Sequence, residues 1–441
     1  MIRHRLLFVL TLLLLLIPLP WPVAAEQYNY IDISNPFLRK TPMAVPMFKA
    51  AAHDPTAMAA AKAASELLVY YLDFTGYFTF SDPAAFLEDP QKMDITGSGI
   101  RYRNWTAIGA ELLVTGGVVI RDGDAEFELR LFDTVKEKMM VGKRYRGSSD
   151  DLRQVARRFC SEVVFAITGS RGFFDSKIAF ISNGSGHKEI YLCEFDGSNI
   201  SRFTRHNSIS LFPDWSSDGR WIAYTTYADK GPKIRIQHVR EKRASWINKP
   251  GLQAAPSWVP GRFELAASLS FSGDQEIYLL TGNGKIIKRL TSSVGIDVEP
   301  TWSPDGKRMA FVSKRSGNPQ IYIYDTFTGR VQRLTFEGRY NTQPNWSPKG
   351  DRIAYSALRN GVIDIFTINP DGGEPIQLTE NQGSNEAPAW SPDGSLIAFS
   401  STRGGKSRIY VMTAYGTDQR RLLTLPGEQT NPKWSPNILN P

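Results

Sequence analysis

A tryptophan-centred motif recurs at a nearly constant interval through the second half of this 441-residue sequence. Pro-x-Trp-Ser-Pro-Asp-Gly occurs at residues 300–306 and 388–394, and residues 344–350 differ from it only by Lys349. Looser copies occupy residues 213–219, 256–261 and 432–436. The tryptophans at positions 215, 258, 302, 346, 390 and 434 are 43 or 44 residues apart, which indicates a repeat architecture.

Each repeat also carries the pattern of four short strands. After the turn at Lys349-Gly350, an apolar triplet at residues 353–355 is followed by a second apolar segment at 365–366 and a strand that ends at 377–379. Together with the strand that carries the tryptophan, this makes four strands in about 44 residues. That arrangement is typical of a propeller blade and not of a helical solenoid.

The order of the motifs predicts how the ring closes. The first repeat begins with the apolar strand at Ile178 and has no tryptophan strand before it, whereas the last repeat ends with the strand at Trp434. We therefore expect the Trp434 strand to complete the blade that begins at Ile178, which gives a closed six-bladed β-propeller over residues 173–441. Closure removes an open sheet edge with unpaired N–H and C=O groups.

The loops that differ most between repeats join the last strand of one repeat to the tryptophan strand of the next. Residues 292–299 and 336–343 are two of them. In a propeller these loops emerge on one face, together with the Gly-containing loops between the two middle strands of each blade. Variation on a shared scaffold is typical of a binding surface. Drift in unconstrained loops produces the same variation, so both interpretations stay open here.

The amino terminus has the pattern of an export signal. Arg3 and Arg5 precede an apolar run at residues 6–17, and the small residues Ala24 and Ala25 follow. This run is shorter than the roughly 20 residues that a membrane-spanning helix needs. We interpret residues 1–25 as a signal peptide that is cleaved before Glu26, so that the mature chain does not span a membrane.

Between the signal peptide and the repeats, residues 26–172 predict a small α/β domain. The expected strands cover residues 43–48, 77–80, 112–120, 126–132 and 138–145, and the expected helices cover 55–74, 105–111 and 149–167. Pro55 at a helix start and Gly76 after its end support the first helix, and Ser149 or Asp150 is the expected cap of the last. Cys160 and Cys193 then fall in different domains, which predicts two separate buried thiols.

Composition and motifs argue against several kinds of chemistry. Lys+Arg 52 and Asp+Glu 44 give a net charge of +8, but the excess is scattered and does not predict nucleic-acid binding. The sequence contains no Gly-x-Ser-x-Gly and no His-Glu-x-x-His. The histidines at positions 53, 187, 206 and 238 are far apart in sequence, which favours surface positions over a shared site. We predict no catalytic residue, metal or cofactor. A glycan-binding propeller or a propeller hydrolase with a carboxylate pair stays open as an alternative.

The residues as a whole resemble a known family. An export signal, Pro-Met-Ala-Val-Pro-Met-Phe at residues 42–48, and six blades closed by Trp-Ser-Pro at residues 434–436 resemble the TolB family of periplasmic Tol-Pal proteins. The resemblance covers essentially the whole mature chain. The second blade departs from the pattern at residues 246–248 and at Val259.

The resemblance implies a non-enzymatic coupling protein in the periplasm of a Gram-negative bacterium. A member of this family is expected to be a monomer that binds the lipoprotein Pal on the loop face and the inner-membrane protein TolA through an amino-terminal tether, here residues 26–37. Other outer-membrane proteins are further expected partners. The implied roles are outer-membrane integrity, envelope invagination during cell division and protein import.

The resemblance also assigns partner-binding residues. For Pal, alignment to the family's binding face selects Leu252, Ala255, Val298, Glu299, Gln343 and Glu386. For TolA, the apolar residues of the tether are Tyr28, Tyr30, Ile31 and Ile33. We hypothesise that Pal occupancy shifts the equilibrium between a docked and a released tether, which requires different affinities of Pal for the two states.

Overall fold

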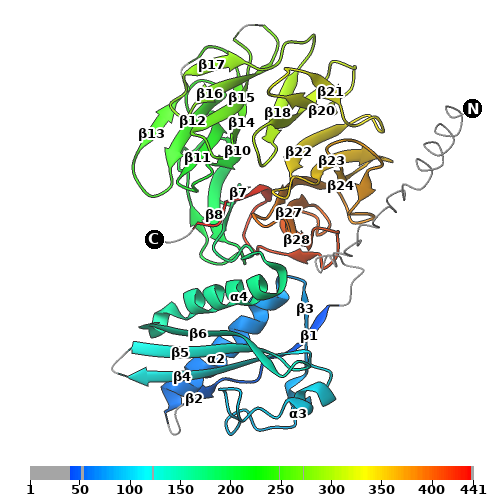
Figure 1. Cartoon of the computed structure of the whole chain (residues 1–441). Coiled ribbons are helices and arrows are strands. Elements are labelled where there is room, and N and C mark those ends of the chain that lie inside the picture. Colours follow the sequence, from blue (N-terminus) through cyan, green and yellow to red (C-terminus); the bar gives the residue numbers. More distant parts are fainter. Residues whose placement is uncertain (1–39, 51–53, 122–123, 248, 272, 439–441) are drawn as a thin grey trace, which may run out of the picture. The chain divides into compact units, whose positions relative to one another are not determined.

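The computed structural model describes residues 40–50, 54–121, 124–247, 249–271 and 273–438. These residues belong to one compact unit. They form a sheet with helices, followed by six four-stranded antiparallel sheets (Figure 1). The predicted signal peptide and tether lie outside the described residues.

The amino-terminal part is a mixed sheet whose strand order is β3-β1-β4-β5-β6, with β2 paired to β4. Figure 1 shows α2 and α4 on one face of this sheet. Its elements are β1 (Thr41–Ala44), β2 (Lys49–Ala50), α2 (Pro55–Asp73), β3 (Phe78–Phe80), the 3-10 turn η2 (Pro83–Ala85), α3 (Tyr102–Ala107), β4 (Leu112–Arg121), β5 (Asp124–Asp133), β6 (Lys138–Ser148), the 3-10 turn η3 (Ser149–Asp151) and α4 (Leu152–Thr168).

Local sequence explains where the two long helices begin and end. The Asp54 carboxylate accepts hydrogen bonds from the N–H groups of Thr56 and Ala57, at 2.9 and 3.0 Å, and so caps α2. Gly169 ends α4 with a left-handed φ of 74°. The predicted cap of this last helix was wrong by one or two residues, because Ser148 caps the short η3 that precedes α4.

Two other predicted elements differ from the structure. The expected strand at residues 43–48 is interrupted after Ala44, because Pro46 has no N–H to donate to a neighbouring strand. The expected helix at 105–111 begins earlier, at Tyr102, and ends before Gly109, which adopts a φ of 79°. The remaining predicted strands and helices of this part match the structure within a few residues.

The six sheets are blades of a β-propeller, which confirms the predicted fold class. Blade 1 consists of β30 (Gln429–Trp434), β7 (Lys177–Ser182), β8 (Glu189–Glu194) and β9 (Ser201–Arg202). Blade 2 consists of β10 (Ser210–Trp215), β11 (Trp221–Thr226), β12 (Lys233–His238) and β13 (Ala244–Trp246). Blade 3 consists of β14 (Gln253–Trp258), β15 (Glu264–Leu269), β16 (Glu276–Thr281) and β17 (Ile286–Arg289).

The last three blades repeat this arrangement. Blade 4 consists of β18 (Asp297–Trp302), β19 (Arg308–Ser313), β20 (Gln320–Asp325) and β21 (Val331–Arg333). Blade 5 consists of β22 (Asn341–Trp346), β23 (Ile353–Arg359), β24 (Val362–Ile368) and β25 (Ile376–Gln377). Blade 6 consists of β26 (Asn385–Trp390), β27 (Leu396–Ser401), β28 (Arg408–Thr413) and β29 (Arg420–Arg421).

Strand β30 closes the ring by pairing with β7, as the order of the motifs predicts. Trp434 pairs with Ile178, and the Lys177 N–H donates a 2.8 Å hydrogen bond to the Ser435 hydroxyl. The innermost strand of blade 1 therefore comes from the carboxyl end of the chain, whereas its other three strands come from the beginning of the propeller.

The tryptophans of the repeat pack between adjacent blades and are nearly inaccessible to solvent. Three of their indole N–H groups donate to a main-chain carbonyl of the preceding blade: Trp215 to Lys433 at 3.2 Å, Trp302 to Ser257 at 3.3 Å and Trp390 to Asn345 at 3.1 Å. The repeated residue thus contributes both buried apolar area and a directional link between blades.

Blade 1 also contacts the helices that precede the propeller. The Tyr71 ring of α2 lies 5.0 Å from the Phe195 ring, and Arg153 of α4 donates a 2.6 Å hydrogen bond to the Asp196 carboxylate. Cys160 in α4 and Cys193 in β8 are both buried free thiols, as predicted.

Candidate docking surface on the propeller

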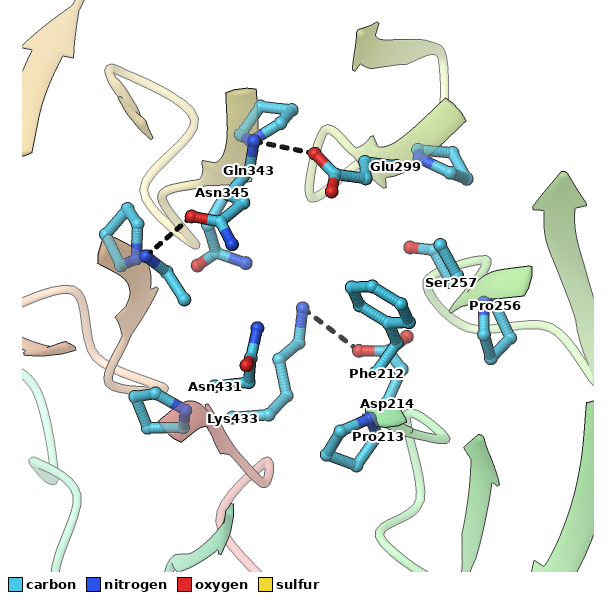
Figure 2. Close-up of a pocket in the computed structure, with 16 residues that line it drawn as sticks. Phe212, Pro213, Asp214, Pro256, Ser257, Glu299, Gln343, Asn345, Asn431 and Lys433 are labelled. Carbon is cyan, nitrogen blue, oxygen red and sulfur yellow. Dashed lines mark hydrogen bonds and ion pairs between the residues drawn. The ribbon is translucent and has the colours of Figure 1, made fainter. Parts of the chain in front are cut away.

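The six innermost strands surround a central cavity of about 100 Å³ (Figure 2). Its wall comes from the same short segment of every repeat: the residue before the motif proline, the proline itself and, in most blades, the residue after it. The residues before the proline are Phe212, Ala255, Glu299, Gln343, Ala387 and Asn431. The cavity is therefore built from the same short segment of each of the six repeats.

A backbone irregularity repeated in all six blades shapes this wall. Each of the six pre-proline residues has a left-handed φ between 49° and 54°, although none is glycine. One extra residue is inserted there against the neighbouring strand, as between Leu211 and Asp214 in β10. Such a β-bulge redirects the side chains around it. In Figure 2, Glu299, Gln343 and Asn431 lie around the central space.

Hydrogen bonds to hydroxyl groups of the preceding blade hold three of the strained pre-proline residues. The N–H groups of Ala255, Ala387 and Asn431 donate to a hydroxyl of the preceding blade's second strand. The acceptors are Thr225 at 3.2 Å, Ser356 at 3.0 Å and Ser400 at 3.0 Å. A left-handed conformation costs a non-glycine residue roughly 1–2 kcal/mol, and these bonds help to offset that cost.

Blade 4 solves the same problem with a different side chain. The residue of blade 4 at the position of these hydroxyls is Val312, as its pairing with Val298 shows. Valine has no hydroxyl to accept the hydrogen bond. The N–H of Gln343 donates instead to the Glu299 carboxylate, at 2.8 Å. Burial in the cavity raises the pKa of Glu299 above its ordinary value, although this hydrogen bond acts in the opposite direction.

The cavity also contains one ion pair. Lys433 Nζ lies 3.0 Å from the Asp214 carboxylate. Figure 2 shows this pair across the cavity from Glu299 and Gln343. The second carboxylate oxygen of Asp214 accepts a 2.7 Å hydrogen bond from the N–H of Trp258. Asp214 therefore links three blades, because Lys433 lies in blade 1 and Trp258 in blade 3.

The residues that the sequence assigned to Pal binding fall into three groups. Ala255, Glu299 and Gln343 line the central cavity. Glu386 lines a second pocket beside it. Leu252 and Val298 are half-buried and are not among the described residues that line either space.

Sequence reasoning also missed part of the cavity wall. The missed residues that carry polar or aromatic side chains are Phe212, Asp214, Ser257, Asn345, Asn431 and Lys433. A consistent reading of the positions on either side of the motif proline in all six repeats finds every one of them.

The loops on the predicted binding side form one face of the ring, which we call the loop face. The two kinds of loop contact each other there. The N–H of Lys314, in the loop between β19 and β20, donates a 3.0 Å hydrogen bond to the carbonyl of Ile296, in the loop between β17 and β18. The opposite face, called here the turn face, carries the Asp-Gly turns and the turns between the two outer strands. There, the N–H of Thr326 donates to the carbonyl of Lys307 at 2.9 Å.

Large apolar side chains are exposed in the loops of the loop face. Val294 is 90% exposed and Phe336 is 71% exposed. Further exposed members of this group are Ile209, Tyr227, Phe271 and Tyr340. They come from loops within blades 2 and 3 and from the connections that lead into blades 2, 4 and 5, so the apolar character is shared by neighbouring loops.

Within the described part of the chain, residues for metal or acid–base chemistry do not gather. No group of three or more His, Cys, Asp and Glu side chains there is arranged to hold a metal ion. His206 contacts the Tyr224 hydroxyl at 2.9 Å. The predicted surface position of His238 was wrong, because this ring is buried and accepts a 2.9 Å hydrogen bond from the Glu241 N–H.

The tether residues assigned to TolA binding, Tyr28, Tyr30, Ile31 and Ile33, lie outside the described residues. Among the helices that the structure describes, none has the length and apolar character needed to cross a membrane.

Comparisons with known proteins agree with this architecture. Residues 164–438 match the TolB beta propeller domain, and residues 29–140 match the TolB amino-terminal domain. The chain is 57% identical over 286 residues to the Tol-Pal system protein TolB of Desulfosudis oleivorans, which covers 65% of each chain. It is 42% identical over 281 residues to the protein TolB homolog of Chlorobium chlorochromatii, covering 64% of this chain and 63% of that one.

The alignments with these two curated relatives thus span less than two thirds of their length. A solved structure is similar over a longer stretch. The crystal structure of TolB from Acinetobacter baumannii superposes with a TM-score of 0.79 at 26% identity, covering 90% of this chain and 97% of that one.

Proposed function

The chain belongs to the TolB family, and we propose from this membership that it is a non-enzymatic, periplasmic component of a Tol-Pal system. In this proposal the loop face binds the lipoprotein Pal and residues 26–37 bind TolA. The protein then contributes to outer-membrane integrity and to envelope invagination during division.

The observation that supports Pal binding is the group of exposed apolar side chains in the loops of the loop face. Val294 and Phe336 expose most of their surface to water, which is unfavourable unless a partner covers them. Polar groups of Glu299, Gln343 and Asn345 line the central cavity of the ring. Mixed apolar and polar contacts of this kind suit a protein interface of standard size.

A titration of the mature chain with the soluble domain of Pal tests this proposal. The double variant Val294→Asp/Phe336→Asp should bind at least tenfold more weakly, because it replaces two exposed apolar side chains of the loop face with charged ones. Phe327→Asp is the matched control, since Phe327 is 97% exposed but lies on the turn face. Equal affinities of the double variant and the wild type would contradict docking on the loop face.

The tether is tested separately from the loop face. A mature chain that lacks residues 26–37 should lose binding to the TolA domain and keep its affinity for Pal. Loss of both interactions, or of neither, would contradict the assignment of the two partners to different parts of the chain. If Pal shifts the tether equilibrium, saturating Pal should also change the affinity of the full mature chain for TolA, by reciprocal linkage.

A further inference from the structure

A second pocket of about 270 Å³ opens on the loop face between blades 5 and 6. Blade 5 supplies an apolar wall of Tyr340, Leu358 and Ile363, and blade 6 supplies the Glu386 carboxylate. Gln343 lines both this pocket and the central cavity, so the two spaces are adjacent.

The polar groups of Ser356 and Gln343 in this pocket are engaged with each other. The Ser356 hydroxyl donates to the Gln343 side-chain carbonyl at 2.8 Å, and the Ala387 N–H donates to both of these groups, at 3.0 and 2.9 Å. Glu386 differs from both. Its side chain is half-buried, and its carboxylate forms no hydrogen bond or ion pair with the residues that the structure describes.

Glu386 is therefore a carboxylate without a counter-charge in a partly apolar pocket. Burial raises the pKa of Glu386 above its ordinary value, and no neighbouring charge contributes to this shift. Removing an ionised carboxylate from water without a partner is unfavourable. A cation that entered the pocket would therefore gain both Coulomb attraction and hydrogen bonds.

The size and walls of the pocket narrow the choice of cation. At about 270 Å³ the pocket is below the usual range for a small-molecule site, which begins near 300 Å³, but it has room for one long side chain. Lysine and arginine carry methylene stems that pack on apolar surface while the charged head seeks a polar partner. Tyr340, Leu358 and Ile363 offer that surface, with Glu386 as the partner of the head.

We propose that the Glu386 pocket receives a lysine or arginine side chain of the protein that docks on the loop face. This inference rests on the proposed function, because it assumes a protein partner on that face. It adds one anchor with defined chemistry to that interface: a basic side chain whose stem lies against Leu358 and Ile363.

The test compares Glu386→Gln with Glu337→Gln in titrations of the mature chain with the soluble Pal domain. Glu337 is a carboxylate on the same face whose side chain is 73% exposed, so its substitution controls for general attraction of a basic partner. Glu386→Gln should bind at least tenfold more weakly, mainly through faster dissociation, whereas Glu337→Gln should change the affinity less than twofold.

A scan of the partner completes the test. Each exposed lysine and arginine of the Pal domain is changed to methionine, and affinities are measured against wild type and Glu386→Gln. Substitution of one basic residue of Pal should weaken binding to the wild type but should not weaken binding to Glu386→Gln further.

Two results would overturn the pocket proposal while leaving the proposed function intact. One is that Glu386→Gln binds Pal as tightly as the wild type does. The other is that the effect of every basic substitution in Pal simply adds to the effect of Glu386→Gln. Absence of binding by the wild type would instead contradict the proposed function. Glu386→Gln should unfold at the same or a higher temperature than the wild type, so a loss of affinity cannot be attributed to misfolding.

Discussion

The N–H of Gln343 in blade 5 donates a 2.8 Å hydrogen bond to the carboxylate of Glu299 in blade 4. In three other places in the ring a Ser or Thr hydroxyl accepts from the equivalent N–H group, as Ser400 does for Asn431. Glu299 therefore serves as a structural replacement for a missing hydroxyl as well as a lining residue of the cavity. Its substitution must be interpreted with both roles in mind.

The raised pKa of Glu299 predicts a pH-dependent contribution to stability. Because the folded state binds the proton more tightly than the unfolded state, the free energy of unfolding falls as the pH rises through and above the ordinary value of 4.5. Glu299→Gln keeps a carbonyl acceptor for Gln343 and does not titrate. The variant should therefore gain stability relative to the wild type as the pH rises from 4 to 8, as followed by urea unfolding.

A tenfold difference in proton affinity between the folded and unfolded states corresponds to about 1.4 kcal/mol. A difference between Glu299→Gln and wild type that stays constant over this pH range would show that Glu299 does not carry the effect.

Restoring the missing hydroxyl in blade 4 should make Glu299 dispensable for the Gln343 contact. Thr is close in shape to Val, so Val312→Thr places a hydroxyl where Thr225, Ser356 and Ser400 stand in other blades. We expect Val312→Thr to stabilise the Glu299→Ala variant by about 1 kcal/mol more than it stabilises the wild type. A double-mutant cycle measured by chemical denaturation gives this coupling, and a value near zero would contradict the replacement.

Closure of the ring should account for a large part of propeller stability. Trp434 is buried in the strand that pairs with β7, and its truncation to Ala should destabilise the protein by about 3–5 kcal/mol. Phe327→Ala removes an aromatic ring of high exposure and should change stability little. Calorimetry of both variants compares the two effects, and similar unfolding temperatures would argue against a closing role for β30.

The two cysteines should behave as independent buried thiols. Burial raises the pKa values of both Cys160 and Cys193, which slows their reaction with thiol reagents at neutral pH. We expect both to be protected in the native protein and to react after denaturation. A reducing agent should leave the unfolding temperature unchanged, and a marked decrease on reduction would indicate a disulfide.

The fold was predictable because the tryptophan motif recurs at a regular interval. Six copies at 43- or 44-residue spacing define the blades, and the displaced half-repeats at Ile178 and Trp434 define the closing strand. Errors arose where a single residue interrupts a local pattern. Pro46 divides a segment that looks like one strand, and Ser148 caps a 3-10 turn that precedes the predicted helix start.

The cavity wall was predictable only in part, because a β-bulge changes which side chains face the channel. Strand alternation is a two-residue pattern, and the extra residue before each motif proline shifts it. Val298 and Glu299 are adjacent in sequence, but Glu299 lines the cavity and Val298 does not. The left-handed φ of Glu299 causes this difference. Such a φ is unusual for a residue other than glycine, so the amino-acid type at position 299 does not predict it.

The pairing of β30 with β7 has a consequence for damage to the chain. The hydrogen bond between Lys177 and Ser435 joins positions 258 residues apart, so blade 1 depends on strands from both ends of the propeller segment. Proteolysis that removes β30 leaves five complete blades, but it exposes the unpaired edge of β7, on which foreign strands can assemble. Loss of this one strand would therefore turn a closed ring into an aggregation-prone open sheet.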